Sequence, residues 1–148
     1  MTLGVPITGQ LASTTDVDYY AVVVGSSGLL SVAFDGPISS SLDYFKVATY
    51  DSAGLLLAQW ATGADKTWQV GVATAGTYYV SVADVGTYSL NSGQYSLTMS
   101  LTSGSAASAE SEPNDSRAAA DAVTLGVPIT GQLASTTDVD YYAVVVGS

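Results

Sequence analysis

The sequence predicts an all-β protein, an antiparallel β-sandwich of jelly-roll type with about eight strands. Two observations lead to this prediction. Apolar and polar residues alternate with a period of two through most of the chain, which is typical of strands with one buried face. Short segments rich in Gly, Ser and Asp separate the alternating stretches at regular spacing, as in sandwiches built from short strands.

The alternation is clearest near residue 100, where Tyr95, Leu97 and Met99 are separated by single polar residues. The segments around Leu30 and Val80 have the same pattern, and all of them end at turn-forming residues. In chain order, the expected strands are 7–12, 19–24, 30–34, 44–50, 55–60, 67–72, 78–82 and 95–101.

One segment has a helical rather than an alternating pattern. Residues 117–122 read RAAADA, and alanine has the highest intrinsic helix propensity. Asn114 or Asp115 precedes this run at a position where its side chain can cap the first turn. We therefore expect one short helix, of one or two turns, in the segment before residue 123.

The chain contains an exact internal repeat. Residues 2–26 and 124–148 are identical, which places 25 residues in two copies at a spacing of 122. The expected organisation is a sandwich at 1–103, an acidic linker with the short helix at 104–123, and the first strands of the next repeat at 124–148. Either the parent protein is an array of nearly identical domains, or the duplication was engineered to offer a spare strand.

The composition excludes several classes of function. A net charge of −10, with three basic residues, argues against nucleic acid and anionic membranes, which both need clustered Lys and Arg. The chain has no Cys and no His, which removes thiolate and imidazole catalysis and the usual zinc ligands. The sequence also contains no Gly-x-Ser-x-Gly motif, so we expect no enzyme activity.

The same composition favours a bacterial surface location. The chain is rich in Ser, Thr and Gly, poor in Lys and free of Cys, which resembles extracellular bacterial proteins more than cytosolic enzymes. No apolar run is long enough to span a bilayer, and residues 1–20 lack the basic and apolar regions of a signal peptide. We therefore expect an extracellular or cell-surface protein.

Two acidic clusters carry the only chemistry that the sequence offers. One is Glu110 to Asp115, and the other is the Asp-Val-Asp-Tyr-Tyr motif, which starts at Asp138 and, in the first copy, at Asp16. Calcium binds six to eight oxygens from carboxylates, amides, backbone carbonyls and water. The oxygen ligands of this kind are Glu110, Glu112, Asn114, Asp138 and Asp140. Alternatively, the first cluster caps a helix and the second begins a strand after a turn.

The order of these motifs also resembles a known family. Residues 112–116 read EPNDS, and an Ala-rich turn, the GQL of 131–133 and the DVDYY of 138–142 follow. Residues 76–82 (GTYYVSV) and 93–99 (GQYSLTM) resemble the closing strands of the same family. This arrangement, which covers about one period of the repeat, is similar to the bacterial pre-peptidase C-terminal (PPC) domain.

The resemblance implies a β-sandwich of the kind appended to secreted peptidases and found in large surface proteins. In relatives that bind collagen, an acidic linker and an Asp-rich turn hold calcium. Carried over by position, this implicates the following residues: Glu110, Glu112, Asn114, Asp115, Asp138 and Asp140, with Asp16 and Asp18 as the counterparts in the first copy. The expected function is a non-catalytic structural or adhesive module, stabilised by calcium.

Two further expectations concern partners. A module that binds a matrix protein or polysaccharide is the alternative function, and its best candidate aromatic residues are Trp60, Trp68, Tyr88 and Tyr95. The second expectation follows from the repeat, because only one copy can fill a given place in one sandwich. Either residues 2–101 fold and the rest trails, or residues 27–148 fold and displace 2–26, or the second copy adds to another molecule as a strand. The last arrangement gives head-to-tail polymers.

Overall fold

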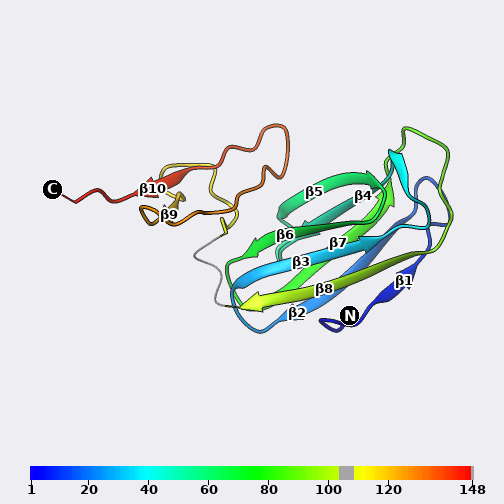
Figure 1. Cartoon of the computed structure of the whole chain (residues 1–148), viewed down its shortest axis with the longest axis horizontal. Helices are drawn as coiled ribbons and strands as arrows, with labels where there is room; N and C mark the ends of the chain where they lie inside the picture. Colours follow the sequence, from blue (N-terminus) through cyan, green and yellow to red (C-terminus); the bar gives the residue numbers. More distant parts are fainter. Residues whose placement is uncertain (104–108, 148) are drawn as a thin grey trace.

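The computed structural model describes residues 1–103 and 109–147, and it contains two four-stranded sheets packed face to face (Figure 1). One sheet has the order β1 (Ile7–Gly9), β8 (Tyr95–Ser103), β3 (Gly28–Asp35) and β6 (Lys66–Val72). The other has the order β2 (Val17–Val24), β7 (Gly76–Asp84), β4 (Ser40–Tyr50) and β5 (Leu56–Gly63). Every pair of neighbours within these two sheets is antiparallel, which confirms the predicted all-β sandwich.

The core lies between the two sheets and follows the alternation in the sequence. In β3, Leu30, Val32 and Phe34 are buried, while Leu29, Ser31 and Ala33 on the other face are half-buried. Aromatic rings pack together within this core. Phe34 lies 5.1 Å from Phe45 and 5.6 Å from Tyr95, measured between ring centroids. Offset and tilted ring pairs at these distances add packing energy beyond the burial of their area.

The first copy of the repeated segment supplies one edge strand to each sheet. β1 pairs with β8 in the register Ile7 to Leu97, and β2 pairs with β7 along its whole length. The apolar residues of this copy that face inward, Leu11, Val22 and Val24, belong to the main core. In this structure, residues 2–26 therefore complete the sandwich.

The segment that follows the sandwich folds differently from the prediction. Among residues 1–103 and 109–147 there is no helix, so the short helix expected before residue 123 is wrong. The Ala-rich run forms a turn, in which Ala119 N donates to Ser116 O at 3.0 Å, and then β9 (Asp121–Val123). β9 pairs in parallel with β10 (Tyr142–Val144), which belongs to the second copy. An isolated run of this length cannot repay the cost of helix nucleation.

The part of the chain that the structure describes contains no helix long and apolar enough to cross a membrane.

Candidate metal centre

The linker and the second copy pack together against the β5–β6 end of the sandwich. Gln59 in β5 donates its side-chain amide to Ala134 O at 3.0 Å. In β6, Gly71 touches the backbone of Glu110, and a Cβ at this position would overlap the Glu110 carbonyl oxygen. Only glycine allows the linker to approach β6 so closely.

Backbone hydrogen bonds fix the linker against the Asp-rich turn of the second copy. Asn114 O accepts from Tyr141 N at 3.2 Å, and Tyr141 O accepts from Asp121 N at 3.0 Å. Glu110 N donates to Thr130 O at 2.9 Å on the other side of the site. Two acidic clusters that are far apart in sequence are thereby held side by side.

Carboxylate oxygens from both clusters converge in this region. One group comprises Glu110, Glu112 and Asp140, and a second comprises Glu112, Asp115 and Asp138. Within each group, one oxygen from every residue lies within 4.8 Å of the others. Glu112 belongs to both groups, so it links them into one acidic centre.

Asn114 lies in the middle of this centre and is fully buried. Its side-chain amide donates to Glu110 Oε2 at 3.3 Å and to Asp121 Oδ2 at 3.2 Å. Both bonds use the Nδ2 group, and within residues 1–103 and 109–147 the Asn114 Oδ1 atom has no hydrogen-bond partner. Glu112 Oε1 and Asp140 Oδ1 are also buried without a partner. Among the residues that the structure describes, three buried acceptor oxygens therefore lack a donor, which is costly unless a water molecule or a cation satisfies them.

The electrostatics of the centre also favour a bound cation. Burial, together with the neighbouring charges of Asp138, Glu110 and Asp140, raises the pKa of Glu112 to about 7. Burial also raises the pKa of Glu110, and Asp140 adds to the shift, although Gln132 N and Tyr142 donate hydrogen bonds that oppose it. The protein thus concentrates negative charge that an external cation would neutralise.

The donor set fits a hard cation. All its atoms are oxygens, from carboxylates and one amide, and the chain has no Cys or His to offer softer ligands. The backbone contacts hold these oxygens in place before any ion arrives. The arrangement offers oxygen ligands for a metal ion.

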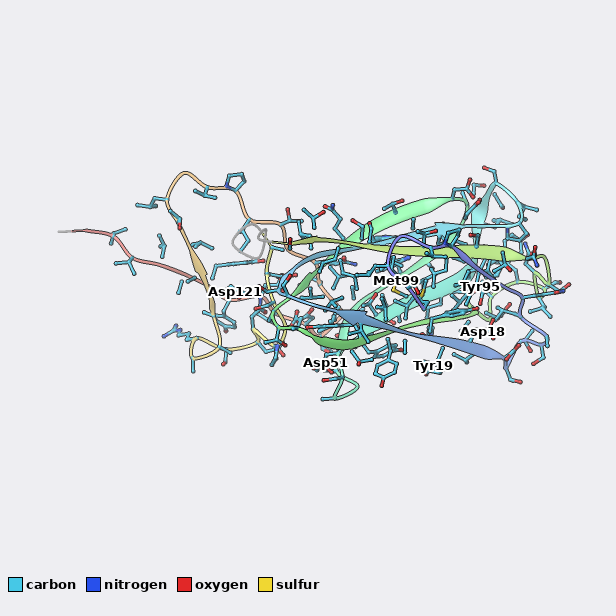
Figure 2. The ribbon with its side chains drawn as sticks, turned by 90° about the horizontal axis from the view of Figure 1, so that it is seen from below. Asp18, Tyr19, Asp51, Tyr95, Met99 and Asp121 are labelled. Carbon is cyan, nitrogen blue, oxygen red and sulfur yellow. The ribbon has the colours of Figure 1, made fainter. Side chains whose placement is uncertain are left out.

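The structure separates the eight predicted ligands into two sets. Glu110, Glu112, Asn114, Asp115, Asp138 and Asp140 all lie in the acidic centre. The other two residues, Asp16 and Asp18, lie at the opposite end of the sandwich. Asp18 Oδ2 accepts from the Tyr95 hydroxyl at 2.5 Å, and Asp16 Oδ2 accepts from Ala12 N at 2.7 Å. Figure 2 shows Asp18 and Tyr95 at the end of the molecule away from Asp121.

Sequence reasoning missed two residues of the centre. Asp121 accepts from Ser111 N at 2.8 Å, from Ser111 Oγ at 2.9 Å and from Asn114, so it orients the central amide. Tyr142 donates its hydroxyl to Glu110 Oε2 at 2.8 Å. Burial and the nearby Glu110 carboxylate raise the pKa of Tyr142, which keeps this donor protonated. Asp121 lies inside the alanine run, and its carboxylate was the only feature of this segment that could have indicated a place in the acidic centre.

The aromatic residues considered for ligand binding are only partly exposed. Tyr95 is buried in the core, and Trp60 is buried beneath Trp68, with their ring centroids 3.9 Å apart. The side chains of Trp60 and Tyr95 point inward from β5 and β8, so they are core residues and do not offer a binding surface. Trp68 is half-buried, with the Lys66 ammonium 5.1 Å from its ring centre, and Tyr88 is exposed.

The comparisons with known proteins bear on the fold. A scan against protein-family models and a search of curated proteins find no match to this sequence. Among solved structures, the PPC domain of a collagenase from Bacillus anthracis matches with a TM-score of 0.52 and 19% identity, over 67% of this chain and 90% of that one. A structure of infectious bursal disease virus, Gt strain, has a TM-score of 0.33 and 10% identity, over 64% of this chain and 28% of that one. The collagenase match confirms the resemblance suggested by the sequence motifs, so this chain has the fold of a PPC domain.

Proposed function

We propose that this chain is a non-catalytic structural module of an extracellular tandem-repeat protein, and that calcium stabilises the junction between its repeats. The observation that carries the proposal is the set of buried, unpartnered oxygens on Glu112, Asn114 and Asp140. These three atoms come from both sides of the junction, because Asp140 belongs to the second copy. An ion bound by all three would join the linker to the next repeat.

Calcium suits this centre better than other common ions. It accepts six to eight oxygen ligands in flexible geometry, and five carboxylates and one amide carbonyl are available here. Magnesium demands stricter octahedral geometry and keeps several waters, while zinc prefers nitrogen and sulfur. Extracellular calcium modules bind with dissociation constants on the order of 10⁻⁴ to 10⁻³ M.

The wider features support an extracellular, load-bearing role. The 25-residue segment recurs exactly at a domain-sized spacing of 122 residues. An array of domains with this spacing would form a long stalk, and calcium at each joint would limit bending between units. The strand orders 1-8-3-6 and 2-7-4-5, with successive strands mostly alternating between sheets, support a jelly-roll connectivity. The similar domain in the bacterial collagenase supports a role as an accessory module outside the catalytic machinery.

Thermal unfolding with ~10 mM calcium and with excess chelator tests the proposal. At 100 times its dissociation constant, calcium should stabilise the fold by about 2.7 kcal/mol, which is several degrees in Tm. Glu112→Gln should abolish this rise because Glu112 belongs to both carboxylate groups. Asp43→Asn, at an exposed carboxylate in β4, is the control and should retain it. Equal melting of the wild-type chain in calcium and in chelator would refute the proposal.

A further inference from the structure

The two copies of the repeated segment have the same sequence but opposite burial. In the first copy, Leu11, Val22 and Val24 are 0%, 1% and 1% exposed. Their counterparts in the second copy, Leu133, Val144 and Val146, are 59%, 47% and 71% exposed. Residues that form the core in one copy therefore face solvent in the other.

The buried copy shows what would cover the exposed one. β1 and β2 are the edge strands of their two sheets, so each pairs on one side only, β1 with β8 and β2 with β7. Both can leave and be replaced without disturbing any pairing between the other strands of the sandwich. An identical segment that enters this place would form the same ladder and bury the same apolar side chains.

We propose that residues 124–148 of one chain replace β1 and β2 in the sandwich of a second copy of this chain. The inference goes beyond the calcium-stabilised module proposed above and needs no bound calcium, because an ion held by Asp140 and Glu112 would keep the second copy against its own linker. Because the donor and acceptor surfaces differ, the contact is heterologous and links successive chains head to tail. The replaced strands are identical, so the ladder lost and the ladder gained are equivalent, and the net cost is the loss of the contacts between the second copy and its own linker. The extent of exchange rises with protein concentration.

The position of the second copy favours a partner over the chain's own sandwich. Gln59, Glu110 and Asn114 hold the second copy at the β5–β6 end of the molecule. The place where β1 begins to pair, beside Leu97 and Tyr95, is at the other end of β8 from Ser103, where the linker leaves the sheet. Insertion into either sandwich requires the segment to leave the contacts with Gln59, Glu110 and Asn114. Its own β1 place lies at the far end of β8, whereas a second chain can present its β7 and β8 beside the exposed face of the docked segment.

Disulfide trapping between two single-cysteine chains tests this inference, and the natural absence of Cys gives no background from other thiols. In β2, the exposed Val23 lies opposite Thr77 of β7. Its counterpart is Val145, so the exchange would bring Val145 of one chain opposite Thr77 of another. Facing residues of antiparallel strands have Cα atoms about 4.5–5.5 Å apart, which suits a disulfide.

Chains carrying Val145→Cys and Thr77→Cys are mixed, heated to the unfolding midpoint, cooled and oxidised. The expected result is a V145C–T77C heterodimer in several-fold excess over the one formed between V145C and Thr67→Cys, an exposed position in β6. A chain with both Val23→Cys and Thr77→Cys, oxidised internally, holds its own β2 and should remain monomeric in sedimentation at concentrations where the wild-type chain associates.

Two results would overturn the inference. One is a yield of heterodimer equal to that of the T67C control. The other is a V145C/T77C double variant that forms only an internal disulfide, because the chain would then capture its own second copy.

Discussion

Tyr142 donates its hydroxyl to Glu110 Oε2 at 2.8 Å, and this bond ties the second copy of the repeat to the linker before it. The equivalent tyrosine of the first copy, Tyr20, has its hydroxyl 2.8 Å from that of Tyr95, which in turn donates to Asp18. The same residue of the repeat thus joins an acidic junction in one copy and the sandwich in the other. Its surroundings decide which partner it takes.

The first prediction uses this equivalence. Asp140→Asn should abolish the calcium-induced rise in Tm, because Asp140 lies in the acidic centre with Glu110 and Glu112. Asp18→Asn changes the same position of the other copy and should retain the rise. It should instead cost about 1.5–3 kcal/mol of stability with or without calcium, since Asp18 accepts a hydrogen bond from Tyr95. Thermal melts of the three proteins decide this, and identical calcium responses in both variants would contradict it.

The second prediction concerns pH in the absence of metal. Burial raises the pKa of Glu112 to about 7 from its ordinary value of 4.5, so the folded chain binds a proton that the unfolded chain releases between these values. The stability from this proton is complete below pH 4.5 and is lost as the pH rises through 7. Burial shifts the pKa of Glu110 in the same direction.

In excess chelator, the Tm of the protein should therefore fall as the pH rises across this interval. Circular dichroism at constant ionic strength measures this Tm. Glu112→Gln should flatten the fall because the amide does not titrate. A Tm that rises with pH over the same range, in chelator, would show that the carboxylates of the junction are not buried together.

The third prediction separates the two copies by their contribution to the core. Leu11→Ala should destabilise the sandwich by about 2–5 kcal/mol, because Leu11 is completely buried. Leu133→Ala alters the same residue of the exposed copy and should change stability by less than about 0.5 kcal/mol. Urea unfolding of dilute protein measures both. A larger loss for L133A than for L11A would mean that the second copy fills the sandwich.

The fourth prediction concerns the contact between β6 and the linker. Gly71→Ala places a Cβ where the carbonyl oxygen of Glu110 lies, so the linker must move away. We expect the calcium-induced rise in Tm to shrink because Glu110 is one of the converging carboxylates. Gly76→Ala, at a position with open space around it, serves as the control and should keep the full rise. A full calcium response in G71A would show that the centre forms without the sandwich.

Much of the fold could be predicted because a half-buried strand has apolar residues on one face and polar residues on the other, and this alternation is visible in the sequence. Each of the eight expected strands overlaps one of β1 to β8, and the inward residues of β3 and β8 are those that the alternation identified. Tyr95 shows the limit of this reasoning. It was recognised as a strand residue and also considered for ligand binding, and only the packing of Phe34 against its ring shows which description holds.

The candidate site was less accessible to prediction, for two physical reasons. Asp121 lies in an alanine run whose local preference is helical. Its carboxylate accepts hydrogen bonds from Ser111 and Asn114, and these tertiary contacts accompany an extended backbone at this position. Asp18 and Asp140 have identical neighbours in sequence, so no local pattern can separate them. Their different surroundings follow from which copy completes the sandwich.

The short-range contacts of the repeated segment are the same in both places. Ala12 and Ala134 each donate a backbone N–H to an aspartate, Asp16 and Asp138, and each copy leaves no room for a Cβ at the glycine beside its tyrosine hydroxyl. The two segments therefore have the same local structure, and the second copy can compete with the first for the sandwich of another chain. During synthesis the first copy has the advantage, because the ribosome produces residues 2–26 and the rest of the sandwich before the second segment exists. Refolding from denaturant removes this advantage, so the history of a sample, as well as its sequence, determines how many sandwiches are completed by a segment from another chain.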